Sequence, residues 1–175
     1  PQCKADRDQR VKAGTTLTKA NRLYRQSIAL IKQYQDPSGA YVASPNFQQY
    51  QYCWLRDGSF IAHAMDRVGA HDSSRAYLRW VDGVLQRHAE KISSLERKLS
   101  RGERPEDQEF LHTRYFLNGE EDTEDNGWGN FQIDGYGTWL WSLAEHVRMT
   151  GDGSFLEEMS SSIRLTCRYL NATYL

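Results

Sequence analysis

Apolar residues recur at intervals of three and four along most of this 175-residue chain, and this spacing limits the fold more than any other feature. Ile61, Ala64, Met65 and Val68 are one example, because a helix places all four on a single face. No segment alternates apolar and polar residues over the length that a half-buried strand needs. The pattern therefore predicts an all-α fold.

Five helices are expected where the apolar spacing is regular and turn residues interrupt it. They cover residues 15–34, 57–69, 72–85, 137–150 and 154–174. Asp36-Pro37-Ser38-Gly39 ends the first helix, and Gly151-Asp152-Gly153 separates the last two. Asp72 and the serines after it are predicted to cap the third helix. The charged run that follows the third helix is typical of a solvated helix end and loop.

Long and short connections alternate along the chain. The long ones, residues 40–52 and 101–130, are of a size that is usually functional inside a compact domain. In a stack of helical hairpins this alternation places every long loop at one end. We expect the two loops to share one face and to form a site there.

Charge and composition exclude several classes of function. The chain of 20.3 kDa is long enough for one domain, and 22 basic against 23 acidic residues leave a net charge of -1. No basic stripe favours nucleic acid, and no apolar run is long enough to cross a membrane. The three cysteines form no disulfide framework or metal-ligand cluster, so no metal site is predicted. Their odd number and the absence of a signal peptide in this segment favour a cytoplasmic location.

The chain is rich in aromatic residues, with five Trp, ten Tyr and six Phe. An aromatic-rich core would explain that share, but aromatic faces also form the walls of sugar-binding clefts. One aromatic motif, YQYCWLRDG, enters the second helix and carries Tyr50, Trp54, Arg56 and Asp57. An adjacent arginine and carboxylate can hold a pair of sugar hydroxyls. Asp57 could equally be only a helix cap with Arg56 as its surface partner.

A second motif, NGWGNFQIDGYG, precedes the fourth helix. Glycines on both sides of Trp128 let the backbone turn tightly, so that the indole can project into a cleft or pack against the protein. Asn130, Gln132 and Asp134 supply polar groups that could brace the loop. Trp128 is therefore a candidate binding residue, and the three polar residues are candidate bracing residues.

Together the two motifs resemble the bacterial and archaeal branch of the glucoamylase family, glycoside hydrolase family 15. The likeness runs from about Tyr24 to the C-terminus and includes YLRWVDGVL. It implies a toroid of six helical hairpins, an (α/α)6 fold, of which this chain would form the first five or so helices. Residues 1–14 would be a poorly ordered lead-in to one incomplete domain. The family releases β-glucose from the non-reducing ends of α-glucans with inversion, and some members act on trehalose or α-1,6-linked glucans.

The resemblance also implies roles for individual residues. Arg56 and Asp57 match the pair that grips the hydroxyls of the terminal glucose, and Tyr50 and Trp54 match the aromatic residues lining that subsite. Trp128 matches a loop tryptophan near the scissile bond. Fungal members carry arginine where this chain has Asn130, so the contacts at the outer subsite do not carry over.

No catalytic residue is expected within this chain. In the family the general acid follows the fifth helix and the general base lies much nearer the C-terminus, so both glutamates would come after Leu175. The acidic cluster Glu120, Glu121, Asp122, Glu124 and Asp125 is predicted to be solvated. Inversion requires two carboxyls roughly 6.5–9.5 Å apart, so this segment alone is expected to be inactive.

The resemblance leaves two further functions open. A non-catalytic carbohydrate-sensing domain shares this fold in the regulatory subunits of phosphorylase kinase, and a purely structural hairpin module would bind no sugar. The expected partners are an α-glucan or α-glucoside and the remainder of the toroid. Apolar faces left without that remainder would favour self-association. No cofactor is expected.

Overall fold

The computed structural model describes residues 20–123 and 129–174, which fall into two compact units, Pro1–Tyr34 and Gln35–Leu175. In the first unit, residues 20–34 form a helix. The start expected for this helix at residue 15 and the expected lead-in over residues 1–14 lie outside the described part of the chain. The second unit contains every other element and the candidate site.

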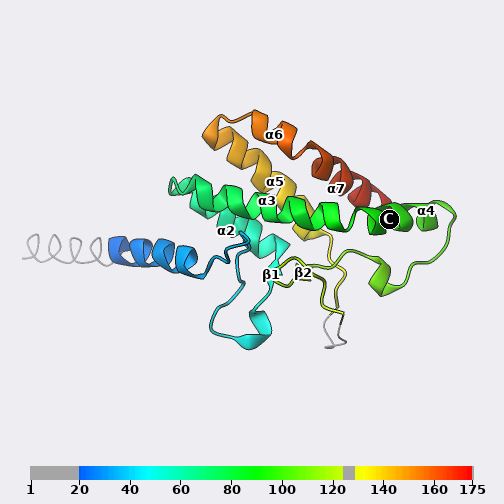
Figure 1. The fold of residues 1–175 in the computed structure, drawn as a ribbon, viewed down its shortest axis with the longest axis horizontal. Coiled ribbons are helices and arrows are strands. Elements are labelled where there is room, and N and C mark those ends of the chain that lie inside the picture. Colours follow the sequence, from blue (N-terminus) through cyan, green and yellow to red (C-terminus); the bar gives the residue numbers. More distant parts are fainter. Residues whose placement is uncertain (1–19, 124–128, 175) are drawn as a thin grey trace, which may run out of the picture. The chain divides into compact units, whose positions relative to one another are not determined.

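Helices dominate the second unit, as the apolar spacing predicts (Figure 1). They are α2 (Leu55–Arg67), α3 (His71–Arg87), α4 (Ala89–Ser100), α5 (Asp134–Thr150), α6 (Ser154–Glu158) and α7 (Ser160–Thr173). Single 3-10 turns lie at Gln48–Tyr50 and Asp107–Glu109. Two short strands, β1 (Cys53–Trp54) and β2 (Arg114–Tyr115), pair antiparallel.

The core forms where α2 and α3 pack on α5 and α7. Helix α2 contacts both α3 and α5, and α7 contacts α3, α4 and α5. Large side chains fill the space between them: Tyr77 from α3, Trp139 from α5 and Tyr169 from α7 are fully buried. This packing fixes the end of α2 at which β1 and β2 lie (Figure 1).

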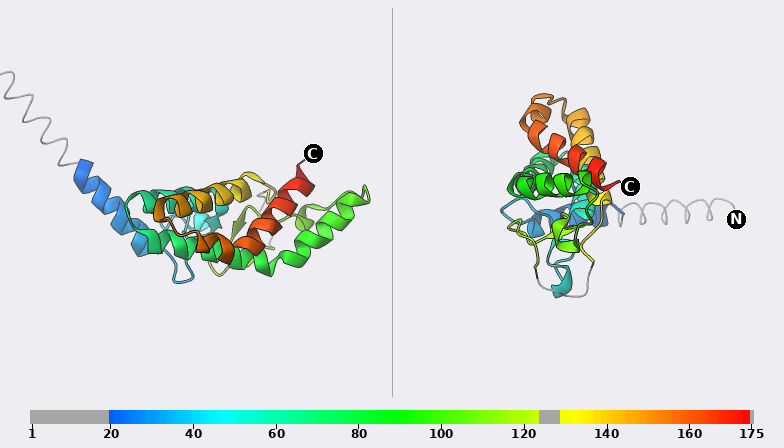
Figure 2. Two further views of the ribbon diagram at one scale, coloured as in Figure 1. Left: turned by 90° about the horizontal axis from the view of Figure 1, so that it is seen from above. Right: turned by 90° about the vertical axis from the view of Figure 1, so that its right-hand side faces the viewer.

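The sequence predicted a solvated helix end and loop for the charged run after the third helix, and this prediction is wrong for residues 89–100. Residues 89–100 form a separate helix, α4, which lies alongside α7 (Figure 2). Ile92 and Leu95 are only 1% and 3% exposed, because they form its contact face. The charges occupy the rest of the helix, so the prediction failed by weighing five charged positions above two buried apolar ones.

Two boundaries also differ from the predicted ones. The last helix is divided at Met159 into α6 and α7. Helix α3 begins at His71 and has no side-chain cap. The serines expected to cap it bind elsewhere: Ser73 Oγ donates to Gln35 Oε1 at 2.7 Å, and Ser74 Oγ donates to Asp66 Oδ2 at 2.7 Å. Among the described residues, none of the helices is both long and apolar enough to cross a membrane.

Candidate functional site

The first motif turns from strand into helix at Trp54. Trp54 pairs with Arg114 in the β1–β2 ladder, and its extended backbone precedes the first turn of α2. That turn carries Arg56 and Asp57, whose side chains are 40% and 46% exposed. The pairing with β2 thus fixes the position of Trp54, and the Arg56–Asp57 pair lies at the surface beside it.

Aromatic rings from the long loop surround Trp54. The Tyr50 ring centroid lies 5.9 Å from that of Trp54, and the Tyr52 centroid lies 5.8 Å from it. Trp54 is 7% exposed and Tyr50 is 37% exposed, so the tyrosine forms the open edge of the group. One indole and one phenol therefore present apolar surface next to the Arg56–Asp57 pair.

The second motif reaches the same place from 78 residues further along the chain. Arg56 Nη1 donates to Asp134 Oδ2 at 2.7 Å and to Gln132 Oε1 at 3.2 Å. The hydrogen bond that Arg56 donates to Asp134 is the main cause that raises the pKa of the Arg56 guanidinium, which therefore keeps its positive charge. Arg56 Nη2 lies 3.6 Å from Asp57 Oδ2, which is a longer contact than the one with Asp134. Asp57 is thus the more available of the two carboxylates.

Gln132 and Asn130 join this loop to β2. Thr113 Oγ1 donates to Gln132 Oε1 at 3.1 Å, and the Thr113 backbone N–H donates to the Asn130 carbonyl at 2.9 Å. Leu55 N–H in turn donates to the Thr113 carbonyl at 3.3 Å. These bonds place Gln132 at the N-terminal end of α2. They are the kind of contact expected of bracing residues.

A cleft of about 270 Å³ opens between these segments. It is lined by residues of both long loops, of the two strands and of the first turn of α2: Ala43, Tyr50, Trp54, Arg56, Asp57, Thr113, Arg114, Gly129 and Gln132. Four of the predicted binding residues, Tyr50, Trp54, Arg56 and Asp57, are therefore brought together. Trp128, the fifth, lies outside the described residues.

Sequence reasoning missed Arg114, a cleft residue that is only 2% exposed. Its guanidinium carbon lies 5.4 Å from the Tyr52 ring centroid and 5.6 Å from the Trp54 ring, which is within cation–π range. Arginine is usually exposed, so a lone arginine in an irregular segment gave no signal of burial. The pairing of β2 with β1 is what carries it inward.

The acidic cluster was predicted to be solvated, and this prediction is wrong for two of its residues. Asp122 is 4% exposed and accepts a hydrogen bond of 2.9 Å from Tyr52 Oη. Glu121 is 14% exposed and pairs with Lys91 Nζ at 2.7 Å. These two carboxylates anchor the loop to the aromatic group and to α4, whereas Glu124 and Asp125 lie outside the described residues.

Comparison with known proteins assigns the family. A family model described as "Glycosyl hydrolases family 15" matches residues 18–175. The chain belongs to this family. Its match to an isomaltose glucohydrolase of Kribbella flavida is 40% identical over 157 residues, covering 89% of this chain and 40% of the relative. An uncharacterized glycosyl hydrolase of Methanocaldococcus jannaschii is 26% identical over 158 residues, 88% of this chain and 22% of that protein.

Solved glycosidases show the same fold. A wild-type glycosidase superposes with a TM-score of 0.84 at 40% identity, covering 91% of this chain and 42% of the other. A glutamate-to-alanine variant solved in complex with glucose gives the same score, identity and coverage. The prediction of helical hairpins from a family 15 toroid is thereby confirmed. This family 15 chain spans about 40% of the length of the relatives named first for sequence and structure.

Proposed function

We propose that the polypeptide carrying this chain hydrolyses α-glucosides from the non-reducing end with inversion and releases β-glucose. In this proposal the cleft at the N-terminal end of α2 holds the terminal glucose ring. The observation that carries it is the meeting of an aromatic edge, Tyr50 and Trp54, with an exposed Arg56–Asp57 pair in one cleft of about 270 Å³. Small-ligand pockets span roughly 300–1,000 Å³, and a cleft just below the lower end of that range suits a single sugar ring.

Each group has a role that its position supports. The apolar C–H face of the sugar packs on Trp54 and Tyr50, while its hydroxyls reach the rim. Asp57 accepts hydrogen bonds from two neighbouring hydroxyls, and Arg56 donates to the same pair. Asp134 and Gln132 hold the guanidinium at 2.7 Å and 3.2 Å, so that Arg56 is positioned before the sugar arrives. Such preorganisation lowers the cost of binding.

The general acid and base of this proposal come after Leu175. Inversion needs one carboxylic acid to protonate the leaving oxygen and one carboxylate to activate water, roughly 6.5–9.5 Å apart. Asp57 and Asp134 both lie against the Arg56 guanidinium, with nitrogen–oxygen distances of 3.6 Å and 2.7 Å. That arrangement suits the binding of hydroxyls, and Asp57 is the one carboxylate among the described residues that line the cleft.

The relatives support the substrate class of this proposal. One of them is an isomaltose glucohydrolase, and a solved glycosidase of the same fold was obtained in complex with glucose. We therefore place glucose in the cleft and short α-glucosides among the substrates. Isomaltose, maltose and trehalose are the panel that separates the α-1,6, α-1,4 and α,α-1,1 linkages.

The test replaces Asp57 by asparagine in the polypeptide that includes the downstream acid and base. We expect kcat/KM on the preferred disaccharide to fall by 100-fold or more, on the order of 3 kcal/mol, because a charge-assisted contact to two hydroxyls is lost. Asp107→Asn is the matched control, since Asp107 is exposed in a 3-10 turn away from the cleft. Its kinetics should equal those of the wild type.

The product and the alternative are settled by the same samples. Proton NMR of fresh product should show β-glucose first, as inversion requires. An Asp57→Asn enzyme with undiminished kcat/KM would remove the cleft from the proposal. Tight glucose binding without turnover on any of the three disaccharides would instead support the carbohydrate-sensing alternative.

A further inference from the structure

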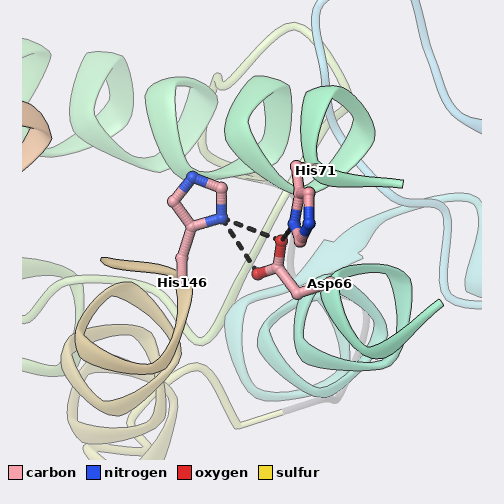
Figure 3. A group of neighbouring side chains, drawn as sticks. All are labelled: Asp66, His71 and His146. Carbon is pink, nitrogen blue, oxygen red and sulfur yellow. Dashed lines mark hydrogen bonds and ion pairs between the residues drawn. The ribbon is translucent and has the colours of Figure 1, made fainter. Parts of the chain in front are cut away.

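Three side chains from three helices converge away from the cleft (Figure 3). Asp66 lies near the end of α2, His71 is the first residue of α3, and His146 lies in α5. Asp66 Oδ1 is 2.8 Å from His71 Nδ1 and 2.9 Å from His146 Nδ1. The histidines are 5 and 80 residues from Asp66 in sequence, so no motif spacing announced the group.

The burial of the group leaves it open on one side only. The side chains of Asp66 and His146 are fully buried, whereas that of His71 is 40% exposed. His71 is therefore the side from which an ion would enter, and its side chain would have to move to open the two buried side chains to solvent.

The donor atoms have the right chemistry and spacing for a transition metal. Two imidazole nitrogens and one carboxylate oxygen form a set typical of zinc sites that keep an open position. One donor atom from each residue lies within 4.8 Å of the others. A tetrahedral ion bound at about 2.0–2.2 Å from each donor spaces neighbouring donors by roughly 3.3–3.6 Å. The observed 2.8 Å and 2.9 Å are shorter, so the two imidazoles must move outward from Asp66 when the ion binds.

The charge of the group also favours a cation. Asp66 is a buried carboxylate, and its ion-pair partners among the described residues are the two histidines. Two neutral imidazoles leave the site with a charge of about -1, and a buried charge without a counter-ion is costly. A divalent cation would reverse that imbalance. Ser74 Oγ, 2.7 Å from Asp66 Oδ2, holds the second carboxylate oxygen in place.

We propose that Asp66, His71 and His146 form a zinc-binding site that fastens the C-terminal end of α2 to α3 and α5. A water on the His71 side completes the tetrahedron. Binding replaces the two imidazole hydrogen bonds to Asp66: each imidazole presents the Nδ1 lone pair to the ion and carries its proton on Nε2. Within the described residues, His146 Nε2 is buried without a hydrogen-bond partner, so moving the proton to it breaks no bond already made by that nitrogen.

The test measures zinc affinity of the full chain after chelator treatment, by competition with a chromophoric chelator. We expect one ion per chain, a higher melting temperature with zinc, and no binding of Mg²⁺, which prefers oxygen donors. His71→Ala should weaken zinc binding at least 10-fold and abolish the thermal shift. His71 is half-exposed at a helix start, so this variant removes a ligand without opening the core.

His63→Ala is the matched control, because it removes one histidine from α2 that contacts Trp141 and not this group. Its zinc affinity should equal that of the wild type. A Co²⁺-loaded sample gives an independent readout, since a tetrahedral site with nitrogen and oxygen donors produces strong visible absorption. Equal zinc affinity in the wild type and His71→Ala, or no zinc binding by the wild type, would show that the three residues form only a hydrogen-bonded network. No step of this test involves a sugar, so its outcome is independent of the proposed hydrolase activity.

Discussion

Gly58, directly after the Arg56–Asp57 pair, is the residue at which the buried core packs against the first turns of α2. A Cβ built on Gly58 would lie 2.4 Å from the Tyr77 ring, and the Tyr77 hydroxyl itself would lie 2.8 Å away. Tyr77 cannot retreat, because it is fully buried and its hydroxyl donates to the Leu55 carbonyl at 2.8 Å. The absence of a side chain at Gly58 is what lets α2 approach α3 this closely.

Gly58→Ala should therefore destabilise the fold by about 1–3 kcal/mol through overpacking. Gly83→Ala is the control: it lies in an exposed turn of α3 with nothing within 4 Å, and should stabilise by about 0.5–1 kcal/mol. Urea denaturation of the two variants checks both signs. If Gly58→Ala were as stable as the wild type, the contact between α2 and Tyr77 would have to be looser than described.

His112 provides a pH-dependent contribution to stability. Burial is the main cause that lowers the pKa of His112, against an opposing effect of Glu121 at 3.9 Å. The folded state therefore binds fewer protons than the unfolded state, whose histidine has a pKa near 6.5. Stability from this residue is present above pH 6.5 and falls as the pH decreases below that value.

We expect the free energy of unfolding to drop between about pH 7.5 and pH 5.5, and to drop less in a His112→Gln variant. Urea titrations at the two pH values measure both changes. His88 has a pKa that burial lowers as well, so part of the pH dependence should remain in the single variant. A wild-type stability that rises on acidification would contradict the sign.

At the scale of elements, α4 shows how a helix can be held by very few contacts. Two buried residues, Ile92 and Leu95, face α7, and Arg168 of α7 bonds to Glu96 of α4 at 3.0 Å. The other residues of α4 are half-buried or exposed, and most of them are polar. Its attachment to the fold should therefore depend on the two apolar side chains and only weakly on the charges.

Ile92→Ala is expected to cost about 2–4 kcal/mol, since it removes a fully buried side chain and leaves a cavity between α4 and α7. Glu96→Gln, which removes the exposed ion pair, should cost less than about 1 kcal/mol. Thermal unfolding of both variants compares the two costs. A larger effect of Glu96→Gln would mean that charge, not packing, docks α4.

At the scale of the whole molecule, aromatic side chains remain exposed on the face shared by α2 and α5. Phe60 is 54% exposed and Trp141 is 40% exposed, and their ring centroids are 5.5 Å apart. Exposed apolar patches of this kind mark surfaces that associate with other protein. The described residues of the second unit leave both rings partly uncovered.

We predict that the 175-residue chain self-associates through this face. Sedimentation at micromolar concentration should give a mass above 20.3 kDa, and a Phe60→Gln/Trp141→Gln double variant should shift it toward the monomer. Leu156→Gln, a change at a 39% exposed leucine on α6, is the control and should leave the mass unchanged. A monomeric wild type would show that the patch is too small to drive association.

Much of this arrangement was predictable at the level of helices. The spacing of apolar residues located the helices, since a stripe at i, i+3 and i+4 must face a core. The same spacing was not enough to reveal α4, where Ile92, Leu95 and Leu99 lie among many charges. Nor could it locate β1 and β2, because a pair of two-residue strands is too short to alternate.

The sequence by itself determined the all-α class, the family and most of the residues that meet in the cleft, because these depend on local periodicity and on two short motifs. Only the tertiary structure decided which distant groups meet. Arg56 reaches Asp134 across 78 residues, and Asp66 reaches His146 across 80. Neither pair leaves a local pattern, since the packing of α2 against α5 alone sets their distance.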